Sequence, residues 1–149
     1  MNVAIIDDHL LRDLLVGRGA DRLAGLGFTR IATTGLWLYR LCSAFASPTS
    51  AGKLSSPVMS LDTALQNRFR EKLVVLPKQV ETVALRELAW SMAELQRSHR
   101  AAGRNLSAAM LEALALAHRL SGSVVVSKLD VGPNLRSAAK ADGIPFRTI

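Results

Sequence analysis

The sequence has little cysteine and no long apolar run. Cys42 is the single cysteine among 149 residues, so no disulfide can form within the chain and packing must supply its stability, as in proteins of a reducing compartment. No apolar run reaches the roughly 18 residues that a membrane span needs. The apolar opening of the chain is shorter than a signal peptide and stops at Asp7 and Asp8. We therefore expect a cytoplasmic protein with no membrane partner.

Acidic residues are also scarce, with 12 of them against 19 Lys and Arg, which gives a formal net charge of +7. Such an excess favours anionic partners, nucleic acid above all. Because the basic residues are spread along the chain, a solvated basic surface is the alternative interpretation. Hydrophobic residues make up 49% of the chain, enough for the core of one domain spanning residues 1–149.

Short apolar segments alternate with helical patterns along the chain. The predicted strands cover residues 2–6, 28–33, 73–76, 124–126 and 144–149. The predicted helices cover residues 10–15 and 36–45, a long segment between Gln79 and Gly103, a segment between Ser107 and Gly122, and residues 135–140. Pro48 and Pro57 predict a long loop at 43–60. Alternating strands and helices imply right-handed crossovers, and hence a three-layer α/β/α sandwich with a mostly parallel central sheet.

Acids follow two of the predicted strands. Asp7 and Asp8 come after the first, and Asp130 after the valine-rich fourth. Ligands of parallel sheets bind beyond the carboxyl ends of the strands, so these acids can share one cleft. Carboxylates beside a basic surface suit a magnesium-dependent phosphodiesterase, because Mg²⁺ takes oxygen ligands, activates water and neutralises phosphate charge.

Each acid also has a simpler interpretation. Asp8 can cap the following helix, and Asp130 can be a turn residue ahead of Gly132. Glu112, on the helix before the valine strand, could point over the same edge of the sheet or be an ordinary exposed helix position. The histidines are not spaced as metal ligands, and we assign no catalytic role to them: His9, His99 and His118.

Basic side chains gather at two places. The group expected to contact phosphate precedes the predicted third strand and consists of Arg68, Arg70 and Lys72. The second group comes at the end of the long helix, where cations complement the helix dipole, and consists of Arg97, Arg100 and Arg104.

Two stretches of the chain are similar to one family. Residues 3–11 read Val-Ala-Ile-Ile-Asp-Asp-His-Leu-Leu, an apolar run that ends in an acid. Residues 106–145 follow with Leu-Ser, a helix containing Glu112, then Gly122, the valine strand ending at Ser127, Asp130, and Gly-Ile-Pro. In this order they resemble a PIN domain, most closely the toxin ribonucleases of VapBC-type toxin–antitoxin pairs.

The resemblance implies a metal-dependent ribonuclease in which Asp7, Glu112 and Asp130 hold Mg²⁺ or Mn²⁺. It also implies RNA, an antitoxin protein and a second copy of the chain as partners. The family usually has aspartate where Glu112 stands, its last acid comes one residue earlier than Asp130, and it carries a glutamate where residues 35–40 here have no acid. We therefore expect weakened activity. The alternative is an inactive PIN-like module that binds RNA or a protein through the helix of Trp37 and Tyr39.

Overall fold

The computed structural model describes residues 2–47, 52–130 and 132–149, apart from the side chain of Asp130. Its centre is a five-stranded sheet in the order β3-β2-β1-β4-β5, and every pair of neighbouring strands is parallel. The strands are β1 (Val3–Ile6), β2 (Arg30–Thr33), β3 (Val80–Glu81), β4 (Ser123–Val126) and β5 (Phe146–Thr148). This confirms the predicted α/β fold with a parallel central sheet.

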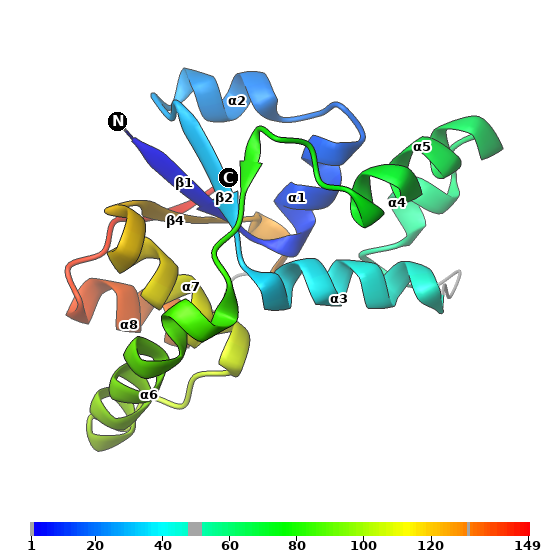
Figure 1. Cartoon of the computed structure of the whole chain (residues 1–149). Helices are drawn as coiled ribbons and strands as arrows, with labels where there is room; N and C mark the ends of the chain where they lie inside the picture. Colours follow the sequence, from blue (N-terminus) through cyan, green and yellow to red (C-terminus); the bar gives the residue numbers. More distant parts are fainter. Residues whose placement is uncertain (1, 48–51, 131) are drawn as a thin grey trace.

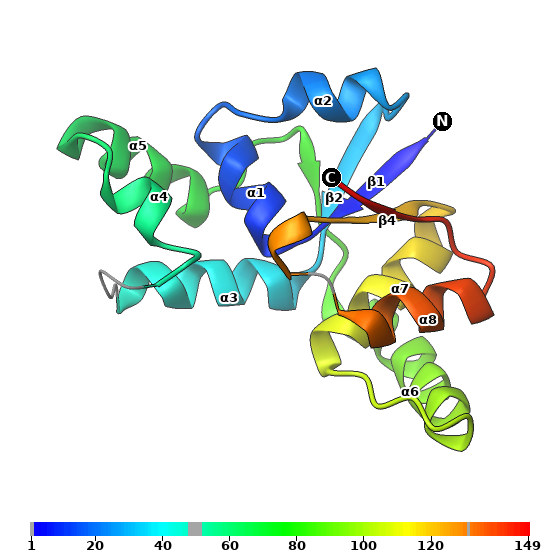
Figure 2. The same cartoon turned by 180° about the vertical axis from the view of Figure 1, so that it is seen from behind.

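Helices cover both faces of the sheet (Figures 1 and 2). One core contains Val3 and Ile5 of β1 and is covered by α6 (Leu85–Ala101), α7 (Ala108–Leu120) and α8 (Pro133–Ala141). The opposite core contains Ala4 and Ile6 and is covered by α1 (Asp8–Leu15) and α2 (Ala20–Gly25). Successive residues of a strand point to opposite faces, so a buried parallel strand must be apolar at every position.

The helix α3 (Gly35–Ala46) begins just beyond β2 and joins the two cores. Trp37 packs in the core under α6 and α7, whereas Leu41 and Phe45 pack in the other core. The short helix α4 (Ser56–Met59) and then α5 (Thr63–Val74) follow, and these helices lie on the right of Figure 1. The rings of Phe45 and Phe69 lie 4.6 Å apart and hold α3 against α5.

Two predictions in this region are wrong. The segment 43–60 is not one loop, because its beginning belongs to α3 and residues 56–59 form α4, while residues 48–51 lie outside the described part of the chain. Residues 73–76 are not a strand. Leu73 ends the buried side of α5, and Val74 and Val75 are exposed. The third strand lies further on, at Val80–Glu81.

Local signals around β4 are confirmed. The Ser107 hydroxyl accepts a hydrogen bond from the Met110 N–H at 3.2 Å and caps α7, as its position predicts. Gly122 then brings the chain close to β1, where a Cβ would lie 2.9 Å from the Val3 carbonyl oxygen. Only glycine fits this approach without a shift of the backbone.

The longest helix, α6, has 17 residues and a mixed surface. Leu88 is buried against α7, whereas Trp90 is exposed and donates its indole N–H to Glu94. Such a helix rests on one face of a domain. Across the described residues, none of the helices combines the length and the apolar character that crossing a bilayer requires.

Candidate acidic site at the carboxyl ends of the strands

Asp7 joins the ends of two neighbouring strands. It follows β1 directly and caps α1, because its Oδ1 accepts a hydrogen bond from the Leu10 N–H at 2.9 Å. Its Oδ2 accepts another from the Ser127 N–H, just after β4, also at 2.9 Å. The side chain is buried, with 3% of the residue exposed. Asp7 therefore lies at the predicted edge of the sheet, with both oxygens bonded to backbone.

Burial governs the protonation of Asp7. Loss of water raises its pKa from 3.8 to about 6, although the two backbone hydrogen bonds favour the charged form, and the neighbouring Asp8 raises the pKa further. The Asp7 carboxyl group is therefore harder to ionise than an ordinary aspartate.

Asp8 is fully buried beside two basic groups. Its Oδ1 accepts a hydrogen bond from the His9 backbone N–H at 2.9 Å and lies 3.0 Å from the His9 Nδ1. Its Oδ2 lies 3.3 Å from Nε of Arg40, on α3, which makes an ion pair without hydrogen-bond geometry. Asp8 does not cap the helix, because Asp7 does.

The pKa of Asp8 moves the opposite way. Burial alone would raise it, but the His9 hydrogen bond and the Arg40 charge outweigh burial, so the pKa of Asp8 is lowered. The same contact with Asp8 raises the pKa of His9. Asp8 is thus held as a carboxylate by groups of the chain itself.

Glu112 lies on α7 and points at the start of α3. The residue is buried, and its two carboxylate oxygens lie 3.2 and 3.1 Å from the Leu36 nitrogen, whose N–H they accept. A Cβ on Gly35 would lie 3.3 Å from Glu112 Oε1, so a larger residue there would displace the carboxylate by a few tenths of an ångström. Burial raises the pKa of Glu112, against the pull of the Leu36 and Gly35 N–H groups. Glu112 is therefore no ordinary exposed helix position, since it ties α7 to α3.

Of the predicted metal ligands Asp7, Glu112 and Asp130, only Asp7 belongs to a group of possible metal ligands in the described part of the chain. Asp7, Asp8 and His9 each place one donor atom within 4.8 Å of the others, and within the described residues Glu112 does not join this group. Asp130 ends the short 3-10 helix η1 (Lys128–Asp130), and its side chain lies outside the described residues. Carboxylates suit Mg²⁺ and Mn²⁺, whereas an imidazole favours later transition metals, and Arg40 already supplies positive charge beside Asp8.

The three basic residues predicted to bind RNA lie on α5 rather than before a strand. All three are exposed. The Lys72 ammonium donates to the Leu15 carbonyl oxygen at 3.1 Å, so it complements the carboxyl end of α1. In the part of the chain that the structure describes, no carboxylate pairs with Arg68 or Arg70. These two arginines remain the better candidates for phosphate contact.

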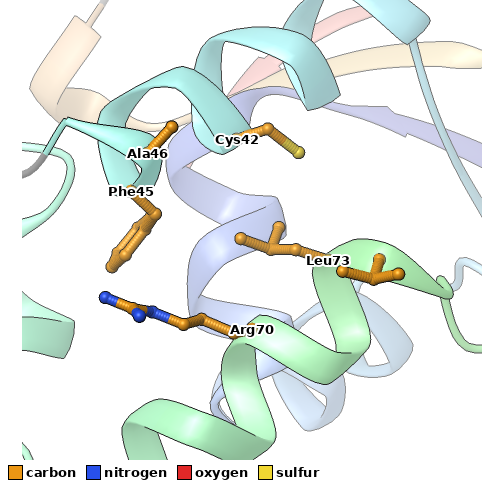
Figure 3. Close-up of a pocket in the computed structure, with 6 residues that line it drawn as sticks. Cys42, Phe45, Ala46, Arg70 and Leu73 are labelled. Atoms are coloured by element: carbon orange, nitrogen blue, oxygen red, sulfur yellow. The ribbon is translucent and has the colours of Figure 1, made fainter.

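A largely apolar groove of about 470 Å³ lies between α3 and α5. Figure 3 shows Phe45 and Arg70 pointing toward each other across it. Its lining residues are Cys42, Phe45, Ala46, Arg70, Leu73 and Val74. Trp37, which the alternative interpretation places at a contact with RNA or a protein, is buried in the core, whereas Tyr39 of the same helix is exposed.

Sequence reasoning missed two members of the acidic site. His9 lacks the spacing of a metal ligand, yet it contacts Asp8 because the two residues are neighbours in the chain. Arg40 lies on the helix where the family resemblance leads one to expect an acid, and no local pattern predicts that it reaches Asp8. The adjacency of Asp8 and His9 was a usable signal, whereas the Arg40 contact needs the tertiary structure.

Comparison with models of known protein families gives no match to this chain, and comparison with curated proteins gives none either.

Proposed function

We propose that this chain is a PIN-like domain that binds RNA, and that its acidic site chiefly stabilises the fold. The observation that carries the proposal is the ion pair between Arg40 and the buried Asp8, at 3.3 Å. A buried carboxylate stays ionised at lower cost when a counter-charge lies beside it. In a metal-dependent nuclease the metal ion supplies it, and here an arginine does.

The other carboxylates support the same interpretation. Asp7 and Glu112 accept hydrogen bonds from the backbone of three segments, at Leu10, Ser127 and Leu36. A cation at this position would compete with Arg40 for Asp8, and below about pH 6 it would also require Asp7 to ionise. Each of these requirements weakens metal affinity.

RNA binding is supported by charge. The chain carries a net charge of +7, and Arg68 and Arg70 project from α5 with no carboxylate partner among the described residues. Arginine suits phosphate because its planar fork of N–H groups can donate two parallel hydrogen bonds.

The test is RNA binding measured by fluorescence anisotropy at several salt concentrations. Affinity should fall steeply with salt, because each neutralised phosphate releases counterions. Replacing Arg68 and Arg70 with Ala should lower the slope of log K against log salt by roughly 1–2, at about 0.7–0.9 per phosphate contact.

The matched control is the double variant Arg18→Ala/Arg22→Ala, which removes the same charge from an exposed region near α2. It should leave most of the slope in place. An RNA affinity that does not change between low and physiological salt would rule out RNA as a partner held by this charge.

A second candidate function is metal-dependent RNA cleavage, which the grouping of Asp7, Asp8 and His9 favours. A divalent ion held there would activate water and neutralise phosphate charge. Asp7 would be a ligand, because its oxygens can accept N–H bonds and still offer a lone pair. Arg40 would oppose the ion.

Two measurements separate the candidates. Purified protein is incubated with structured RNA with and without Mn²⁺, and thermal unfolding is followed in the same solutions. The leading proposal expects no metal-dependent cleavage and no increase in Tm with Mn²⁺. Cleavage that requires Mn²⁺, is lost in Asp7→Asn and increases in Arg40→Gln would establish the nuclease instead.

A further inference from the structure

A buried polar cluster lies at the end of α6, away from the acids of the candidate site. His99 is 1% exposed. Its Nε2 lies 2.8 Å from Oδ2 of Asp142, the residue that follows α8, and its Nδ1 lies 2.9 Å from Nε of Arg104. The cluster therefore connects α6, the loop after it and the end of α8 through one imidazole.

Chemistry fixes the direction of these hydrogen bonds. The Nε of arginine is always a donor, so Nδ1 of His99 must accept and carries no hydrogen. The hydrogen of the neutral ring is then on Nε2, which donates to the Asp142 carboxylate. The Asp142–His99 pair thus holds the Arg104 guanidinium by its Nε, and the two terminal amino groups are left for other partners.

Arg104 also lines a cavity of about 260 Å³. It is lined by Gln96, His99, Arg100, Arg104, Asn105 and Leu106. Two guanidinium groups and two primary amides contribute many N–H donors, and no carboxylate is part of the lining. Among the described residues, neither Arg100 nor Arg104 pairs with a carboxylate.

Hydrogen bonding to the carbonyl oxygens of His99 and Arg100 does not account for these arginines. The carbonyl oxygens of His99 and Arg100 already accept hydrogen bonds from the backbone N–H groups of Arg104 and Gly103. Arg104 also lies beyond α6, in the loop that leads to α7. Two cations therefore face one cavity whose nearest backbone acceptors are occupied.

We propose that this cavity binds a phosphate group. A phosphate offers several charged acceptor oxygens, which match the donors of Arg100, Arg104, Gln96 and Asn105. Arg104 is the positioned member of the set, because its orientation is fixed by a buried pair before any ligand arrives. Such preorganisation lowers the entropic cost of binding.

The site does not depend on the proposed RNA-binding function. The phosphate can belong to an RNA backbone or to a small molecule such as a nucleoside monophosphate, and both present the same oxygens. The experiment therefore uses three probes: inorganic phosphate, AMP and a short single-stranded RNA.

The experiment is NMR titration of the full-length ¹⁵N-labelled protein with each probe. Saturable shifts should appear at the Arg104 Nε–H and at the side-chain amides of Gln96 and Asn105. Saturation by phosphate or AMP would identify a small-molecule site, and saturation by RNA alone would identify a backbone phosphate. Absence of saturable shifts with all three probes would overturn the proposal.

Two variants distinguish binding in this cavity from attraction by the general positive charge of the protein. Arg100→Gln should weaken binding about tenfold, since a charge-assisted hydrogen bond contributes more than a neutral one. Arg97→Gln removes the same charge from the same helix but does not line this cavity, and it should change affinity less than about twofold, as expected of a screened surface charge. Equal weakening by both variants would overturn the proposal.

Arg104→Lys tests the positioning by His99. A lysine keeps the positive charge but lacks the planar guanidinium group, and with it the Nε–H that donates to His99. We expect it to weaken phosphate binding and to shift the His99 ring resonances even without ligand. Unchanged ring resonances together with unchanged affinity would show that the His99 contact does not position the site.

Discussion

The carboxyl ends of the strands and the end of α6 use charge in opposite ways. At the strand ends, Asp7, Asp8 and Glu112 are buried, and their oxygens contact backbone N–H groups, His9 and Arg40. At the end of α6, the Asp142–His99 pair and Nε of Arg104 are bonded to one another, and Arg100 and Arg104 line a cavity. Buried charge must be satisfied by the fold, whereas charge at a cavity is available to a ligand.

The largest expected effect is the removal of Asp8. In Asp8→Ala the buried His9 ring and the His9 backbone N–H both lose their partner, and the ion pair with Arg40 is lost. We therefore expect the free energy of unfolding to fall by roughly 3–4 kcal/mol, because unsatisfied buried donors are costly. Urea denaturation measures this. Glu87→Ala breaks an exposed ion pair with Arg119 and should cost less than about 1 kcal/mol. Similar costs for the two variants would remove the contrast between buried and surface charge.

The pH dependence of Asp7 is the next largest effect. Its pKa rises from 3.8 to about 6 on folding, and a difference of that size corresponds to about 3 kcal/mol. Because the folded-state pKa is the higher one, this stabilisation is fully present below the unfolded value of 3.8 and is lost as pH rises through 6. In Asp7→Asn the contribution is absent.

Urea unfolding from about pH 4 to about pH 7 tests this, because the titration of Asp7 spans that range. The wild type should lose stability relative to Asp7→Asn as pH rises. Asp62 caps α5 in the same way, by accepting the Leu65 N–H at 2.9 Å, but it is exposed. Asp62→Asn therefore replaces a cap of the same kind without removing a buried carboxyl group, and it is the matched control. A constant difference between wild type and Asp7→Asn across the range would contradict the raised pKa.

At the end of α6, Asp142→Ala should have a smaller effect. It leaves the Nε2–H of the buried His99 without its acceptor, which costs about 2 kcal/mol for an unsatisfied buried donor. Differential scanning calorimetry against Asp21→Ala, an exposed acid on α2, measures the difference. A Tm equal to that of Asp21→Ala would show that the Asp142–His99 pair does not stabilise the contact between α6 and the end of α8.

The smallest effect is expected at the cavity. Arg100 is exposed and makes no ion pair within the described residues, so Arg100→Gln should change the free energy of unfolding by less than about 0.5 kcal/mol, as most surface substitutions do. The same urea titrations report it. A loss of unfolding free energy above 1 kcal/mol, about twice that surface limit, would mean that Arg100 stabilises the fold, as Asp8 does.

Predictions from sequence succeeded where local patterns were decisive. Consecutive valines at 124–126 predicted a strand buried on both faces, and Ser107 marked the start of α7. They failed at 73–76, because a short apolar run does not distinguish a strand from the end of a helix. The periodicity that places Leu73 one turn after Phe69 was the signal for α5, and Asp62 was its cap.

The sequence alone determined the alternation of strands and helices, and therefore a parallel sheet with Asp7 at the end of its first strand. It did not determine what the acids do there. Asp7 meets a backbone N–H 120 positions away, and Glu112 meets one 76 positions away. Caps and apolar periods are set by neighbours in the chain, so sequence reveals them. The partner of a buried charge is set by packing between distant segments, so only the tertiary structure decides it.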